Sequence, residues 1–169
     1  NRVQVNGVPT SRQARGGGME DGVKKDDGNA GLDSDSSRQY RTLIVDDVAG
    51  SAKILGILFR KLGQDRVELA NSGQEAIDKA TAFLPEIIIL DLMLGDMTGL
   101  TVVRKLRQIP KFRETLIVAL SGNSSEEARQ ETSAAGFDLH LAKPIGVNDV
   151  RDIIARRRAR QTDDSTTGE

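Results

Sequence analysis

A short apolar run that ends in an aspartate constrains the fold of this chain more than any other stretch. Residues 87–90 read Ile-Ile-Ile-Leu, and Asp91 follows directly. A run this short, β-branched and apolar on both faces is typical of a strand in a parallel sheet covered by helices. Gly95 and Gly99 then begin a loop. Asp91 is therefore expected at the carboxyl end of a buried strand, where open α/β sheets place their ligand chemistry. A lone aspartate there could instead cap the next helix.

The same strand-then-helix pattern recurs five times along the chain. Short apolar runs predict strands at residues 42–45, 66–70, 85–90, 115–120 and 137–141. Amphipathic stretches predict helices at residues 53–62, 72–83, 100–107 and 125–135 and from about residue 147. Ser72 and Glu75 fit a capping box for the second helix, and the third helix must end before Pro110. Alternating strands and helices predict an α/β fold with a parallel sheet and helices on both faces.

The two ends of the chain lack this periodicity. Residues 1–40 are rich in glycine and in balanced charges, and they contain few apolar residues to offset the entropy of ordering. We therefore expect a disordered tail or linker at residues 1–40, one folded domain at residues 41–158 and a disordered tail at residues 159–169. The arginines of residues 156–160 fit a solvated helix end better than an anion site.

Composition excludes several kinds of site. The chain has no cysteine and a single histidine, His140, so disulfides, thiolate metal sites and multi-histidine metal sites are excluded. It has no tryptophan and few aromatic residues for stacking on bases. No apolar stretch has the length of a membrane span. We expect a cytoplasmic protein with no membrane association and no direct contact with nucleic acid.

Five polar side chains fall at the ends of predicted strands. Asp46 and Asp47 follow the first strand, Asp91 the third, Ser121 the fourth and Lys143 the fifth. In a parallel sheet these ends share one edge, so three carboxylates converge, and at least one would take up a proton unless a cation neutralises them. Oxygen ligands alone favour Mg²⁺. With the lysine and the hydroxyl, the cation would cradle a phosphoryl group, which Asp91 would accept as an acyl phosphate.

Each of these residues also has an ordinary structural interpretation. Asp46 and Asp47 could cap the first helix, Ser121 could cap a turn, and Lys143 could be a surface lysine before a proline. A haloacid dehalogenase-type phosphatase would need a second aspartate where Met93 stands. A nucleotide-binding module would need a glycine-rich turn after the first strand, and the sequence has no such spacing there. The coincidence of all five polar residues at strand ends favours the phosphoryl site.

Four motifs carry a resemblance to a known family. They are Leu43-Ile-Val-Asp-Asp47, Ile88-Ile-Leu-Asp-Leu-Met-Leu-Gly-Asp-Met-Thr-Gly99, Ala119-Leu-Ser-Gly122 and Leu141-Ala-Lys-Pro144. Together with their spacing, they resemble the receiver domain of two-component response regulators over roughly residues 41–155. The resemblance implies the flavodoxin-like strand order 2-1-3-4-5 with five helices. It implies Asp91 as the phosphoacceptor, with Asp47, Asp91 and the Met93 carbonyl binding Mg²⁺ and Asp46 acting mostly through a bound water.

The resemblance also assigns roles near the fourth and fifth strands. It implies Ser121 as the switch hydroxyl, Lys143 as the contact to the phosphoryl group and a cis peptide bond before Pro144. Two positions depart from the family pattern. Gly95 replaces a frequent proline, so a more mobile loop is expected. His140 occupies the switch position where tyrosine or phenylalanine is common, and we expect it to move inward when Ser121 is drawn toward the phosphoryl group.

The resemblance predicts a phosphorelay receiver that takes its phosphoryl group from the phosphohistidine of a histidine kinase or a phosphotransfer protein. Its own chemistry would be limited to self-phosphorylation and autodephosphorylation, and it would pass the signal to a downstream protein partner. A phosphorylation-dependent dimer is a further option. Two alternatives stay open: a receiver fragment of a hybrid histidine kinase, which the sequence Phe137-Asp-Leu-His-Leu-Ala-Lys-Pro144 resembles, and a pseudo-receiver that binds proteins without phosphorylation.

Overall fold

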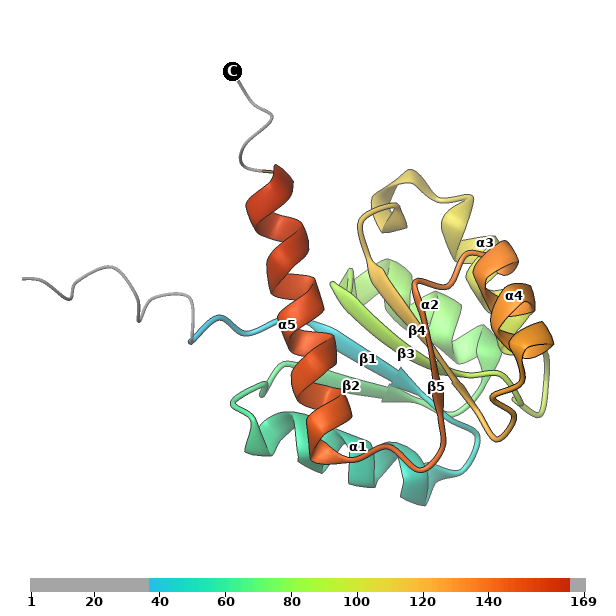
Figure 1. Ribbon diagram of the computed structural model, residues 1–169, viewed down its shortest axis with the longest axis horizontal. Coiled ribbons are helices and arrows are strands. Elements are labelled where there is room, and N and C mark those ends of the chain that lie inside the picture. Colours follow the sequence, from blue (N-terminus) through green and yellow to red (C-terminus); the bar gives the residue numbers. More distant parts are fainter. Residues whose placement is uncertain (1–36, 165–169) are drawn as a thin grey trace, which may run out of the picture. The chain divides into compact units, whose positions relative to one another are not determined.

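The described part of the chain, residues 37–164 of a computed structural model, contains a five-stranded parallel sheet in the order β2-β1-β3-β4-β5 (Figure 1). The strands are β1 (Thr42–Val45), β2 (Val67–Ala70), β3 (Ile87–Asp91), β4 (Leu116–Ser121) and β5 (Leu139–Ala142). The helices are α1 (Ala49–Lys61), α2 (Gly73–Phe83), α3 (Gly99–Arg107), α4 (Glu126–Ala135) and α5 (Val147–Asp164), with a short 3₁₀ turn at η1 (Pro110–Phe112). The predicted fold class and strand order are confirmed.

Alternating side chains of the central strands supply two hydrophobic cores. Leu43, Ile88 and Leu90 face a core shared with α2, α3 and α4, whereas Ile44 and Ile89 face a core shared with α1 and α5. Figure 1 shows these two helical layers on opposite faces of the sheet. All five side chains are fully buried, which explains why the central strands read as continuous apolar runs rather than as alternating ones.

The register of the sheet brings the ends of its strands together. Val45 pairs with Leu90, so the residues that follow them, Asp46 and Asp91, lie level on adjacent strands. On the other side of β3, Asp91 pairs with Leu120, one residue before the end of β4. Ser121 pairs with Ala142 at the end of β5. The predicted convergence at one edge follows directly from this register.

Helix caps agree in part with the sequence. The Ser72 hydroxyl accepts a hydrogen bond from the Glu75 amide at 3.1 Å, as in a capping box. The Glu75 carboxylate returns to the amide of Asn71, one residue before the position that a capping box predicts. Ser125 caps α4, and Thr98 caps α3. The acidic pair does not cap α1, because the residue at its N-cap is Val48.

Described structure extends beyond residues 41 and 158, the limits predicted for the folded domain. Tyr40 is fully buried, and its amide donates to the Gln64 side chain at 2.7 Å, so the ordered chain begins before residue 41. Helix α5 continues through Asp164, past the predicted boundary at residue 158. Arg160 contributes to this extension because its guanidinium binds Asp138 at 2.7 Å. Residues 1–36 and 165–169 of the two predicted tails lie outside the described residues.

The fifth strand departs from its predicted limits, whereas the cis bond expected after it is present. The fifth strand begins at Leu139 rather than at residue 137, because Gly136 ends α4 in a left-handed conformation and Phe137 packs into the core. The peptide bond between Lys143 and Pro144 is cis, as the resemblance implied. Among the described helices, none is long and apolar enough to cross a membrane.

Candidate functional site

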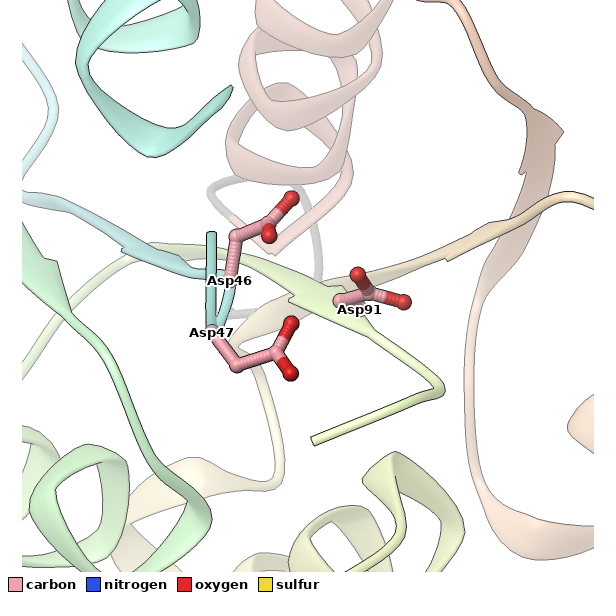
Figure 2. Close-up of side chains that lie close together, drawn as sticks. All are labelled: Asp46, Asp47 and Asp91. Atoms are coloured by element: carbon pink, nitrogen blue, oxygen red, sulfur yellow. The ribbon is translucent and has the colours of Figure 1, made fainter. Parts of the chain in front are cut away.

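Three carboxylates meet at the carboxyl edge of the sheet. Asp46 and Asp47 come from the end of β1 and Asp91 from the end of β3, and one oxygen from each lies within 4.8 Å of the others. Figure 2 shows the three side chains extending into the same space. Asp46 and Asp91 are 2% and 5% exposed, whereas Asp47 is open to solvent. Close like charges, two of them buried, favour a bound cation.

Lys143 supplies the positive charge next to this cluster. Its Nζ atom lies 2.9 Å from Asp46 Oδ2 and 2.5 Å from Asp91 Oδ2. Burial alone would lower the pKa of Lys143, but the hydrogen bonds and charges of Asp91 and Asp46 outweigh it and raise that pKa. Lys143 is therefore a cation of the site and not an isolated surface lysine.

Backbone amides hold the other oxygens of the two buried carboxylates. The Val48 amide donates to Asp46 Oδ1 at 2.9 Å, and the Met93 amide donates to Asp91 Oδ1 at 3.0 Å. Each carboxylate thus has one oxygen on Lys143 and one on the backbone of the following loop. This arrangement fixes the orientation of both carboxyl groups. It also shows that Asp91 does not cap α3.

Ser121 lies beside this cluster at the end of β4. Its side chain is buried, and its hydroxyl oxygen accepts a hydrogen bond from the Asn123 amide at 3.0 Å. The interpretation of Ser121 as a turn-capping residue is therefore correct for this structure. A hydroxyl can donate while it accepts, so the turn does not prevent Ser121 from serving as a donor to an incoming anion.

Met93 contributes its backbone to the site, and the residue is largely exposed. The Met93 side chain is 76% exposed, and its backbone forms an isolated antiparallel bridge with Thr98 across the β3–α3 loop. The thioether offers no strong hydrogen-bonding group to the site. Any ligand that Met93 provides to a cation must therefore be its carbonyl oxygen.

His140 is already inside the protein. Its Nε2 atom lies 2.9 Å from the Asn123 carbonyl oxygen, and its Nδ1 atom lies 3.0 Å from the Thr132 hydroxyl. Because a carbonyl can only accept, Nε2 must be the donor. His140 is thus buried in this structure, at 9% exposure, and its movement on phosphorylation stays a prediction. It links the β4–α4 loop to α4.

The β3–α3 loop is anchored by a residue that the sequence reading missed. Asp96 accepts hydrogen bonds from the amides of Gly73 at 2.7 Å and Gln74 at 2.9 Å, at the amino end of α2. These hydrogen bonds lower the pKa of the Asp96 carboxyl. The sequence signal was an aspartate beside Gly95, but nothing in the sequence points to its distant partner.

An apolar cavity adjoins the acidic cluster. It has a volume of about 230 Å³ and lies between α1 and the segment after β5. Its wall includes Ile54, Leu58 and Ile145, and Asp46 and Lys143 also line it. Ile54 is 63% exposed, so the mouth of the charged site has an apolar rim.

The donor set fits magnesium. The carboxylates are hard oxygen donors, and the exposed position of Asp47 leaves room for water in the coordination shell. The described cluster contains no sulfur or imidazole ligand, so it matches Mg²⁺ better than zinc or copper. Lys143 adds a positive charge on one side, which suits a site that must also accept an anion.

Comparison with known proteins identifies the family. Residues 42–155 match the response regulator receiver domain, and the chain belongs to this family, which serves two-component and phosphorelay signalling. It is 28% identical over 124 residues to the signal transduction histidine-protein kinase BarA of Shigella flexneri, covering 73% of this chain and 13% of that protein. It is also 28% identical over 116 residues to sporulation initiation phosphotransferase F of Bacillus subtilis, covering 69% of this chain and 91% of that protein.

A solved structure of the same family holds a metal. The receiver domain of sensor histidine kinase PA1611 from Pseudomonas aeruginosa has magnesium coordinated in its active-site cleft. It superposes with a TM-score of 0.66 at 26% identity, over 72% of this chain and 99% of that one. This chain thus spans about an eighth of the length of BarA but nearly all of a separate receiver domain.

Proposed function

We propose that this chain accepts a phosphoryl group on Asp91 with the help of Mg²⁺. The ion would be held by Asp46, Asp47, Asp91 and the carbonyl of Met93. The observation that carries the proposal is the contact of Lys143 with Asp91 at 2.5 Å, beside three carboxylates that share one small space. A carboxylate with a fixed cation on one side and a metal-binding cluster on the other is prepared to become an acyl phosphate.

The transfer is a displacement at phosphorus. An Asp91 oxygen attacks the phosphorus atom of a phosphohistidine, a P–O bond forms, the P–N bond breaks, and the imidazole leaves with the electron pair and takes up a proton. Bound Mg²⁺ supplies positive charge to the equatorial oxygens. The Asp91 carboxylate loses its own charge when it is phosphorylated, so Lys143 is released from it and can bind a phosphoryl oxygen. The Ser121 hydroxyl donates to another.

The rim of the site fits a protein donor. Val48 and Ile54 are 57% and 63% exposed at the amino-terminal half of α1, and Ile57 is 50% exposed one turn further on. Exposed apolar side chains around a charged cleft favour an apolar partner surface that carries the phosphohistidine to Asp91. A histidine kinase or a phosphotransfer protein is the partner that this arrangement favours.

Signal output would begin at Ser121. If a phosphoryl oxygen draws the hydroxyl away, the Asn123 amide loses its 3.0 Å acceptor. The Asn123 carbonyl holds His140, which in turn contacts Thr132 of α4. We therefore expect the β4–α4 loop and α4 to shift together, changing the surface around β5 that a downstream protein partner or a second copy would bind.

A receiver within a longer histidine kinase is the second candidate. Its support is the match to BarA, of which this chain spans 13%. A pseudo-receiver that is not phosphorylated is less well supported, because the three carboxylates and Lys143 are all present and in contact range. In either setting the receiver itself would extend from about residue 40 to Asp164.

Incubation with acetyl phosphate and Mg²⁺ tests the proposal. Intact-mass spectrometry should show one added phosphoryl group on the wild-type protein, stable in acid and labile in base. Asp91→Asn should show none, and a metal chelator should abolish the addition to wild type. Asp152→Asn, a control at an exposed residue of α5, should retain it. A phosphorylated Asp91→Asn protein, or metal-independent transfer, contradicts the assignment.

A further inference from the structure

Asp96 connects the phosphoacceptor loop to a helix that is distant in sequence. Its two carboxylate oxygens each accept one backbone hydrogen bond, from Gly73 at 2.7 Å and from Gln74 at 2.9 Å. These amides are at the first turn of α2, where N–H groups have no partner within the helix. A negative charge there is also favoured by the helix dipole. The lowered pKa of Asp96 agrees with a carboxylate held in its charged form.

Two further contacts hold the same loop. Next to Asp96, Met97 packs so closely over Gly73 that a side chain on Gly73 would collide with its thioether. At the end of the loop, Gly99 lies against the Asp91 carbonyl and leaves no room for a side chain. The loop is thus bound to α2 in the middle and to β3 at its end.

Because residue 95 is a glycine, the loop depends on the hydrogen bonds of Asp96 to α2 for its conformation. Its position is open, with no atom within 4 Å of where a side chain would begin. Glycine gives the backbone more freedom than any other residue, so the segment after Met93 has little restriction of its own. The two charge-assisted hydrogen bonds that the Asp96 carboxylate accepts supply that restriction.

We propose that Asp96 is a positioning residue for the phosphoryl site. By binding the amino end of α2, it fixes the β3–α3 loop so that the Met93 carbonyl and the Asp91 carboxylate keep the spacing that Mg²⁺ requires. It touches neither metal nor substrate. This role rests on the proposed function, because it assumes that Met93 and Asp91 bind the ion. Groups that orient metal ligands from outside typically change metal affinity about tenfold or more when removed.

A Mg²⁺ titration that is monitored by amide NMR chemical shifts measures this role. Asp96→Ala should raise the Kd for Mg²⁺ about tenfold and slow phosphorylation by acetyl phosphate at subsaturating Mg²⁺, with recovery when Mg²⁺ is saturating. Asp96→Asn keeps one acceptor oxygen and should give an intermediate Kd. If the alanine variant does not fold, the asparagine variant carries the same test.

Ser72→Ala is the matched control. The Ser72 hydroxyl also caps α2, through the Glu75 amide, but it does not contact the β3–α3 loop in any described hydrogen bond. If Asp96 only stabilised the helix, the two alanine variants would change Mg²⁺ affinity alike. Equal Kd values for both variants, or an unchanged Kd in Asp96→Ala, overturn the positioning role. Wild-type protein that binds no Mg²⁺ at all overturns the proposed function as well.

Discussion

Replacing Asp47 with asparagine should stabilise the metal-free protein, and Mg²⁺ should cancel this gain. Asp47 lies within 4.8 Å of two other carboxylates, and among the described residues no lysine or arginine forms an ion pair with it. At that separation the repulsion between two charges is about 0.9 kcal/mol in a water-like dielectric. Lys143 offsets part of the charge of the two neighbours. Asp47→Asn should therefore stabilise the metal-free protein by about 1 kcal/mol, or roughly 3–5 °C in Tm.

Mg²⁺ should remove this advantage. At a Mg²⁺ concentration ten times the wild-type Kd, binding stabilises the wild-type protein by about 1.4 kcal/mol. If the loss of one charged ligand weakens binding about tenfold, the variant gains about 0.4 kcal/mol under the same conditions. The two proteins should then have nearly equal stability, although the variant is more stable in a chelator.

Thermal unfolding in chelator and across a Mg²⁺ series provides the assay. Glu131→Gln, which removes an exposed charge on α4, should leave both the metal-free stability and the Mg²⁺ response unchanged. The reasoning fails if Asp47→Asn is less stable than wild type without metal. It also fails if both proteins gain the same stability from Mg²⁺, because Asp47 would then not be a ligand.

Two other substitutions test the surroundings of the site. Met93→Asn should speed loss of the phosphoryl group several-fold, a barrier change of about 1 kcal/mol, because an amide beside Asp91 can orient an attacking water. Equal rates of dephosphorylation in variant and wild type, or a wild-type half-life of seconds rather than many minutes, would contradict this. Arg107→Met should cost about 3 kcal/mol in urea unfolding, because its guanidinium binds Asp138 at 2.8 Å and several backbone carbonyls. Exposed Arg104→Met is the control, and an equal effect of the two changes would refute the argument.

The fold and the acidic site were predictable because both follow from the backbone. Short apolar runs identify buried strands, and parallel strands end at a common edge. Asp46 and Asp91 each follow such a run directly, and Lys143 follows the predicted fifth strand with one residue between, so their meeting needs no knowledge of side-chain packing. The register of β1 with β3 then places the two carboxylates level.

What the sequence did not reveal depends on contacts between distant side chains. Tyr40 follows a polar segment, yet it is buried because Gln64 binds its amide and Arg157 lies 5.9 Å from its ring centre. Asp96 reads as a loop aspartate, and its partners lie more than twenty residues earlier in the chain. The hydrogen bonds of His140 to the Thr132 hydroxyl and the Asn123 carbonyl join it to two other segments, and such contacts cannot be predicted from a local pattern.

The loops that follow β3 and β4, on either side of Asp91, each form hydrogen bonds to a helix of the same layer. Asp96 ties the β3–α3 loop to α2, and His140 ties the β4–α4 loop to α4. Both helices pack on one face of the sheet, whereas the apolar rim belongs to α1 on the other face. A change of charge at Asp91 therefore has direct routes into the layer of α2 and α4. If the proposed donor surface on α1 is correct, we expect the α1 layer to keep its shape while the opposite layer responds.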